Sequence, residues 1–196
     1  MKFQLSPEQR QLVWSIRDVA RDEFHGRTKQ YMDGTFPWEN IRTLAKMGIL
    51  GMSVPEEYGG SGLPVFDTAL VLEEIAKVCY PTAMAVLGEV GVQTRIISTY
   101  APEHMKQRIL PKVCSGEYIL AVCMTEPHAG TDVANYRTNA TTHGDKVRLN
   151  GVKTLISRVD EAQVFVVFSR IDGKPGREGI GCVLIERGTP GFVVTS

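Results

Sequence analysis

The sequence lacks the features that mark several large classes of protein. Its four cysteines, Cys79, Cys114, Cys123 and Cys182, are widely scattered without a CxxC pair, and its four histidines show no metal-ligand spacing. Apolar runs are far shorter than the ~20 residues that cross a bilayer, and the opening MKFQLSPEQR has no signal-peptide core. We therefore expect reduced thiols rather than disulfides, no metal site, no membrane span and a cytoplasmic location.

The sequence also lacks an excess of positive or negative charge. The 22 Lys and Arg residues balance the 22 Asp and Glu residues, and neither sign forms a long block. Proteins that grip nucleic acid or an anionic membrane carry a concentrated basic surface. The composition, with 43% hydrophobic residues, instead predicts a globular protein whose partners are not selected by net charge.

The first half of the chain has the apolar spacing of helices. Ser6 and Pro7, with Gln9 three residues after the serine, form a helix start, and Leu12 and Ile16 then share a face. The same reasoning predicts further helices at residues 38–46, 66–78, 82–100 and 103–114. The stretch 82–100 is so apolar that we expect it at the centre of a helical bundle.

The second half changes to the short alternating runs of strands. The candidates are YILAVCM, RTNATT, KVRLNGVKTLIS, QVFVVFSRI, GIGCVLIE and GFVVTS, separated by Gly, Asp and Asn turns. Parallel strands need long crossover connections, usually helices, so these runs favour antiparallel pairing. The predicted fold class is α+β: an all-α helical bundle over residues 1–117, followed by an antiparallel β-barrel or sandwich over residues 118–196.

The polar loop MTEPHAGTD, residues 124–132, directly follows the first predicted strand. Its Thr and Gly residues can offer hydroxyls and bare backbone N–H groups to a bound anion or ring, although the same residues are ordinary turn formers. The loop lies where the two halves meet, and clefts between domains are favoured ligand sites. No GxGxxG motif follows a strand, which argues against a nicotinamide dinucleotide fold.

These segments together resemble the N-terminal half of the acyl-CoA dehydrogenases, flavoproteins that oxidise acyl-CoA thioesters at the α and β carbons. The resemblance covers the whole chain and is most specific in MTEPHAGTD. The other matching segments are LSPEQRQLVWSIRDVARDEF, MGILGMSVPEEYGGSGLP, VLEEIAKV, EHMKQRILPKVCSGE, NGVK and TPGF. The resemblance implies FAD as cofactor and an acyl-CoA as substrate, with an electron-transfer flavoprotein as a possible partner.

The resemblance also assigns residues to the flavin. Met124 would pack on the isoalloxazine ring and Thr125 would bind its polar edge. Gly130 and Thr131 would approach the pyrophosphate, and Thr131 would also lie near the acyl-CoA. The remaining flavin contacts implied are Val122, Leu155, Ile156 and Ser157.

Several departures from the family pattern accompany these matches. Leu155 stands where the family has a tryptophan, His128 where a glycine is usual, and Ser157-Arg158-Val159 replaces Thr-Asn-Gly. The family's catalytic base is a glutamate of a C-terminal helical domain, which we expect to be absent because the sequence ends at GFVVTS. Glu126 is a local carboxylate of the loop, and we expect it to fix the loop by accepting backbone N–H bonds rather than to act as a base.

The sequence leaves several functions open. The resemblance favours an FAD-dependent dehydrogenase that is inactive as this chain alone. An acyl-CoA oxidase or a flavin monooxygenase of the same superfamily would share these segments, and so would a non-catalytic module that binds an acyl-CoA or a partner chain. The resemblance further implies a homo-oligomer or a partner that supplies the missing domain. Because the sequence ends within a predicted strand, we also expect an unpaired strand edge that invites association.

Overall fold

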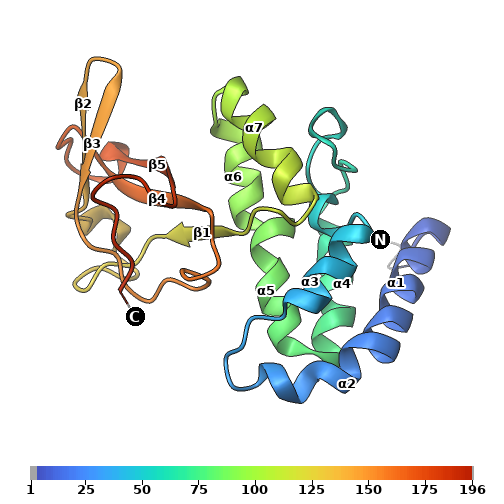
Figure 1. The fold of residues 1–196 in the computed structure, drawn as a ribbon. Coiled ribbons are helices and arrows are strands. Elements are labelled where there is room, and N and C mark those ends of the chain that lie inside the picture. Colours follow the sequence, from blue (N-terminus) through green and yellow to red (C-terminus); the bar gives the residue numbers. More distant parts are fainter. Residues whose placement is uncertain (1–3, 196) are drawn as a thin grey trace. The chain divides into compact units, whose positions relative to one another are not determined.

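The computed structural model describes residues 4–195. The chain forms two compact units, and the boundary between them along the sequence falls between Tyr118 and Ile119. The first unit contains all the long helices, and the second contains the sheet (Figure 1). Helices followed by a sheet confirm the α+β class predicted from the sequence. None of the helices in the described part of the chain is both long and apolar enough to cross a membrane.

The helical unit opens with α1 (Pro7–Val19), whose start is the predicted one. The Ser6 hydroxyl accepts a hydrogen bond from the Gln9 amide, and the Gln9 side chain accepts one from the Ser6 amide, which forms a capping box. The chain continues helically through a π turn at residues 20–24. The other elements of this unit are α2 (His25–Arg27), α3 (Trp38–Lys46), α4 (Val65–Val78), α5 (Tyr80–Val90), α6 (Val92–Tyr100) and α7 (Glu103–Cys114).

The expected helix over residues 82–100 is two helices, α5 and α6. Gly91 separates them with φ −126° and ψ −109°, so the backbone leaves the helical region at this residue. A Cβ at Gly91 would lie 2.5 Å from the Leu87 carbonyl oxygen, so the break requires glycine. As expected, α5 buries most of its residues, although Tyr80, Met84 and Leu87 on it are exposed.

The second unit is a mixed sheet with β4 at its centre. Its strands are β1 (Leu120–Cys123), β2 (Asn139–His143), β3 (Lys146–Asn150), β4 (Val164–Ile171) and β5 (Ile180–Glu186). One edge of β4 pairs with β1 and, further along, with β2, while the other edge pairs with β5. The β2–β3 hairpin is visible in Figure 1. The buried cluster of this unit contains Ala121, Cys123, Ala162, Phe165 and Val167.

The prediction of antiparallel pairing holds for β2–β3 and β4–β5 but is wrong for β1–β4 and β2–β4, which are parallel. The prediction assumed that parallel strands need a crossover helix. Here the crossover from β1 to β4 is made by the polar loop, the β2–β3 hairpin and the segment 151–163. The sheet is therefore mixed without any long helix in this unit.

Two predicted strand segments are irregular. β3 ends at Asn150, and the KTLIS part of the expected strand is coil because Leu155 adopts φ 56° and Arg158 φ 62°, both outside the extended region. The segment GFVVTS forms no strand over residues 191–195, and Ser196 lies outside the described residues. Phe192 instead packs against Phe165, with ring centroids 4.7 Å apart.

Candidate functional site

The polar loop begins where β1 ends and folds back on itself at once. Glu126 and Ala129 exchange backbone hydrogen bonds of 3.0 and 3.1 Å around the tight turn Pro127-His128. His128 is exposed, and its Nε2 lies 3.2 Å from the Asn135 carbonyl oxygen and 3.4 Å from the Glu126 carboxylate. The turn thus holds residues 126–129 as a compact unit and leaves Gly130 and Thr131 exposed beyond it.

Glu126 is the buried anchor of the loop. It is 3% exposed, and its carboxylate accepts hydrogen bonds from the amides of Arg137 at 2.8 Å and Thr138 at 3.0 Å. The same carboxylate pairs with the Lys153 ammonium at 2.8 Å. The expectation that Glu126 fixes the loop by accepting backbone N–H bonds is therefore confirmed. An acceptor engaged on both oxygens in this way is badly placed to remove a substrate proton.

The electrostatics of this pair follow from burial and hydrogen bonding. Burial by itself raises the pKa of Glu126, but hydrogen bonds from Lys153, Thr138 and Arg137 outweigh it and lower the pKa to about 2. Burial lowers the pKa of Lys153, and the Glu126 carboxylate opposes that shift. Glu126 is thus a carboxylate at neutral pH.

Lys153 joins the loop to a second segment. Its ammonium donates to the Met124 carbonyl oxygen at 2.8 Å and lies 3.8 Å from the centre of the Tyr136 ring. The amide of the next residue, Thr154, donates to the Thr125 carbonyl oxygen at 2.9 Å. Two consecutive residues therefore hold two consecutive carbonyls. This arrangement brings Met124 and Thr125 beside the stretch that continues into Leu155.

The residues assigned to a flavin fall into two groups. Val122 is half-buried in β1, Thr125 is half-buried, and Met124 is 36% exposed. The hydrogen bonds from residues 153 and 154 hold Met124 and Thr125 next to the segment 155–157. Gly130 and Thr131 are exposed on the other side of the 126–129 turn, and no described hydrogen bond ties them to that segment.

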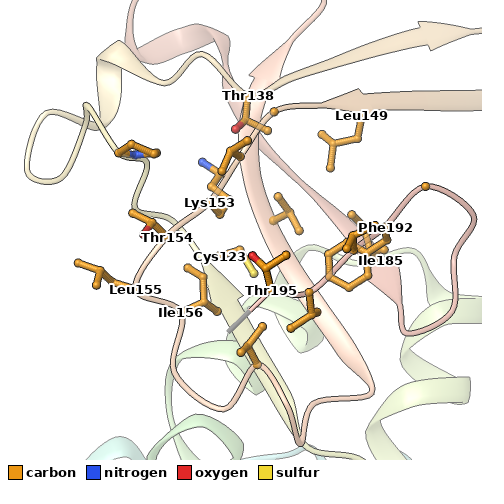
Figure 2. Close-up of a pocket in the computed structure, with 18 residues that line it drawn as sticks. Cys123, Thr138, Leu149, Lys153, Thr154, Leu155, Ile156, Ile185, Phe192 and Thr195 are labelled. Atoms are coloured by element: carbon orange, nitrogen blue, oxygen red, sulfur yellow. The ribbon is translucent and has the colours of Figure 1, made fainter.

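Within the segment 155–157 the three residues differ in their surroundings. Leu155 is 86% exposed and has φ 56°, an unusual conformation for a branched apolar side chain. Ile156 is half-buried and packs on the core cluster of the sheet. Ser157 is exposed. In Figure 2, Ile156 lies near Cys123, whereas Leu155 points away from it.

A pocket of ≈ 720 Å³ lies within the second unit, over one face of the sheet (Figure 2). Its lining includes Cys123, Leu149, Val167, Ile185 and Phe192. Of the residues assigned to a flavin, only Leu155 and Ile156 line it. Lys153 and Thr154 line the pocket as well, so it lies beside the candidate site, which the hydrogen-bonded segments 124–125 and 153–157 define.

Cys123 lies between the candidate site and the core. It is 4% exposed, and burial raises the pKa of its thiol to about 11. A thiol with such a pKa is protonated and unreactive at neutral pH. Cys123 therefore acts as a small buried hydrophobic residue rather than as a redox thiol.

Sequence reasoning assigned no role to three residues that shape the site. Lys153 was seen only as part of the NGVK segment. The Tyr136 ring receives the Lys153 ammonium. Arg170, from β4, donates to the carbonyls of Tyr136 at 3.2 Å and of Ala134, and so supports the end of the loop. The only signal available for Lys153 was the need for a cation beside a carboxylate buried in a turn.

Comparison with known proteins identifies the family. The family model described as "Acyl-CoA dehydrogenase, N-terminal domain" matches residues 6–117, and the model described as "Acyl-CoA dehydrogenase, middle domain" matches residues 121–196. An acyl-CoA dehydrogenase of Bacillus subtilis is 32% identical over 192 residues, covering 97% of this chain and 50% of that protein. The chain belongs to the acyl-CoA dehydrogenase family.

Solved structures agree with this assignment. The butyryl-CoA dehydrogenase of Megasphaera elsdenii superposes with a TM-score of 0.90 at 31% identity, covering 98% of this chain and 52% of that one. An FAD complex of PigA gives a TM-score of 0.90 at 27% identity, covering 97% of this chain and 51% of that one. The chain thus spans about half the length of the relatives it matches.

Proposed function

We propose that this chain provides the FAD-binding part of an acyl-CoA dehydrogenase, which oxidises an acyl-CoA thioester between its α and β carbons. The observation that carries the proposal is the pair of hydrogen bonds from Lys153 and Thr154 to the carbonyls of Met124 and Thr125. They join the two segments that family resemblance assigns to the flavin ring. Membership of the family supports the same assignment.

The side chains at these segments suit a flavin ring. Met124 and Leu155 are both exposed, and together they offer apolar surface to a large flat ring. The backbone and hydroxyl of Thr125 would bind the polar edge of the ring. Ile156 would support the ring from the core side, Val122 would do so from β1, and the exposed Ser157 hydroxyl would reach its reactive region.

Gly130 and Thr131 suit the pyrophosphate. Nothing lies within 4 Å of the position a Cβ would take at Gly130, so a ligand can approach its backbone closely. The Thr131 hydroxyl is exposed and can donate to an anionic oxygen. Asp132, the next residue, accepts a hydrogen bond of 2.6 Å from the Asn135 side chain, so its negative charge is engaged by a donor within the chain. We also assign Thr131 to the acyl-CoA.

When bound at these segments, FAD would supply the hydride acceptor for oxidation of the substrate. The chain's own residues orient the flavin and shield one of its faces, while a carboxylate must remove the α proton. Glu126 does not fill that role, because it is buried, ionised and paired with Lys153. We propose that the base comes from outside residues 4–195, and that an electron-transfer flavoprotein accepts the electrons.

The direct test is a titration of the purified chain with FAD, followed by its visible spectrum and flavin fluorescence, with the intact mass confirming the length of the chain. We expect the visible spectrum to show the absorbance band of protein-bound flavin. Failure of the chain to bind FAD even in large excess would refute the proposal for this chain.

A matched pair of variants locates the two ends of the flavin. Thr131→Val is nearly isosteric and removes only an exposed hydroxyl. It should weaken the binding of FAD and leave the binding of riboflavin unchanged, because riboflavin has no pyrophosphate. Met124→Ala should weaken both ligands because it acts on the ring. Equal effects of Thr131→Val on FAD and riboflavin would contradict the assignment of Thr131 to the pyrophosphate.

A further inference from the structure

We propose that Lys153 is a positioning residue for the flavin: it fixes the spacing between the Met124-Thr125 segment and the segment 154–157. This inference rests on the proposed function, because the flavin is what the two segments would hold. Lys153 would act through backbone carbonyls and side chains of the chain and not by touching the flavin itself.

The surroundings of the ammonium group carry the inference. The Lys153 side chain is only 8% exposed, although lysine is almost never buried unless it is paired. Its Nζ donates to the Met124 carbonyl oxygen and to Glu126 Oε1, both at 2.8 Å, and lies 3.8 Å from the centre of the Tyr136 ring. All three partners belong to residues 124–136, while Lys153 follows the β2–β3 hairpin.

The two contacts of Lys153 have separate consequences. The ion pair with Glu126 compensates two buried charges and therefore affects stability. The bond to the Met124 carbonyl oxygen affects geometry, since the neighbouring Thr154 amide binds the next carbonyl, that of Thr125, at 2.9 Å. Without the ammonium group, one of the two ties between the segments is lost. A variant that removes both charges can therefore separate stability from positioning.

The experiment compares the full chain with Lys153→Met, with the doubly neutral Glu126→Gln/Lys153→Met, and with Arg17→Met as a control. Arg17 pairs with the buried Glu74 in the helical unit, so its loss removes one of two cations from a buried carboxylate that keeps Lys77. Each variant is measured for FAD dissociation constant by fluorescence, for unfolding by urea, and for hydrogen exchange at the Thr154 amide by NMR.

We expect Lys153→Met to be less stable, to exchange faster at Thr154, and to bind FAD about tenfold more weakly, as loss of one charge-assisted tie between the segments would give. The double variant should recover much of the stability, because no unpaired carboxylate remains buried. Its FAD affinity should stay low and its Thr154 exchange fast. Arg17→Met should change neither FAD affinity nor Thr154 exchange.

The outcomes distinguish this inference from the proposed function. If FAD affinity recovers together with stability in the double variant, Lys153 has only a structural role and the inference is overturned. Unchanged Thr154 exchange in Lys153→Met would also overturn it, whether or not flavin binds. If the parent chain binds no FAD while Thr154 exchange depends on Lys153, the proposed function fails and the link between the segments stands.

Discussion

Replacing Glu126 by glutamine should destabilise the sheet unit strongly and in a pH-dependent way. The change keeps the size of the side chain but removes its charge, and it leaves the Lys153 ammonium, 8% exposed, without a counter-charge. Breaking a buried pair by removing one partner costs about 3 kcal/mol or more. Glutamine has a single, neutral oxygen, so the amide of either Arg137 or Thr138 also loses its acceptor and the other keeps only an uncharged one. We therefore expect a loss of about 3 kcal/mol at neutral pH.

The pH dependence has a definite sign. The pKa of Glu126 lies at about 2 in the folded chain, below its ordinary value of 4.5, so protonation favours the unfolded state. The stabilisation by the carboxylate is complete above pH 4.5 and is lost as the pH falls towards 2. Below that pH the parent also carries a neutral side chain beside charged Lys153. The difference between parent and Glu126→Gln should therefore shrink through this window.

The assay can be made specific to the sheet unit. The only two tryptophans, Trp14 and Trp38, both lie in the helical unit, so their fluorescence follows that unit. Hydrogen exchange of the β4 amides follows the sheet. We expect Glu126→Gln to raise exchange in β4 at pH 7. Unchanged β4 exchange, or a difference that does not diminish between pH 4.5 and 2, would refute the buried-pair argument.

Two further predictions concern the candidate site, and a third concerns the cysteines of the sheet unit. Gly130→Ala should leave urea unfolding unchanged, because its Cβ meets nothing within 4 Å, and should weaken FAD binding. In the control Gly60→Ala the Cβ would lie 2.1 Å from a backbone carbonyl oxygen, so this variant should unfold at a lower urea concentration. Equal losses of stability in the two variants would count against the assignment of Gly130. Leu155→Trp should tighten FAD by about fivefold, the ~1 kcal/mol of an aromatic contact, in a fluorescence titration, and a weaker complex would contradict the ring assignment. Maleimide labelling followed by mass spectrometry should modify the exposed Cys182 and spare the buried Cys123, and faster labelling of Cys123 would contradict its burial in the sheet unit.

The elements read most reliably from the sequence are those whose signals are local. The capping box at Ser6 and Gln9 depends only on neighbouring residues, and it is present as predicted. The role of Glu126 was also predictable, since a carboxylate beside Pro127 in a turn needs backbone donors. Such features need no knowledge of how distant parts of the chain meet.

The predictions that were wrong concern features that depend on contacts between distant segments or on single backbone torsions. The parallel pairing of β1 with β4 joins Leu120 to Val164, and apolar alternation is the same in parallel and antiparallel strands. The left-handed conformation of Leu155 keeps the segment beyond β3 out of a strand, and nothing in the local sequence predicts that torsion. The partner of Glu126 lies 27 residues further along, so Lys153 could be found only from the fold.

The parallel pair β1–β4 also constrains the order of events during synthesis. Leu120, the first residue of β1, pairs with Val164, so β1 has no partner until β4 has been made. Translation at about 5 to 20 residues per second makes Val164 roughly 2 to 9 s after Leu120. The apolar segment LAVC has no strand partner during that time. The β2–β3 hairpin, whose pairing is local, can form within that interval. The strand that leads into the polar loop 124–132 thus stays unpaired on the ribosome until β4 has been made.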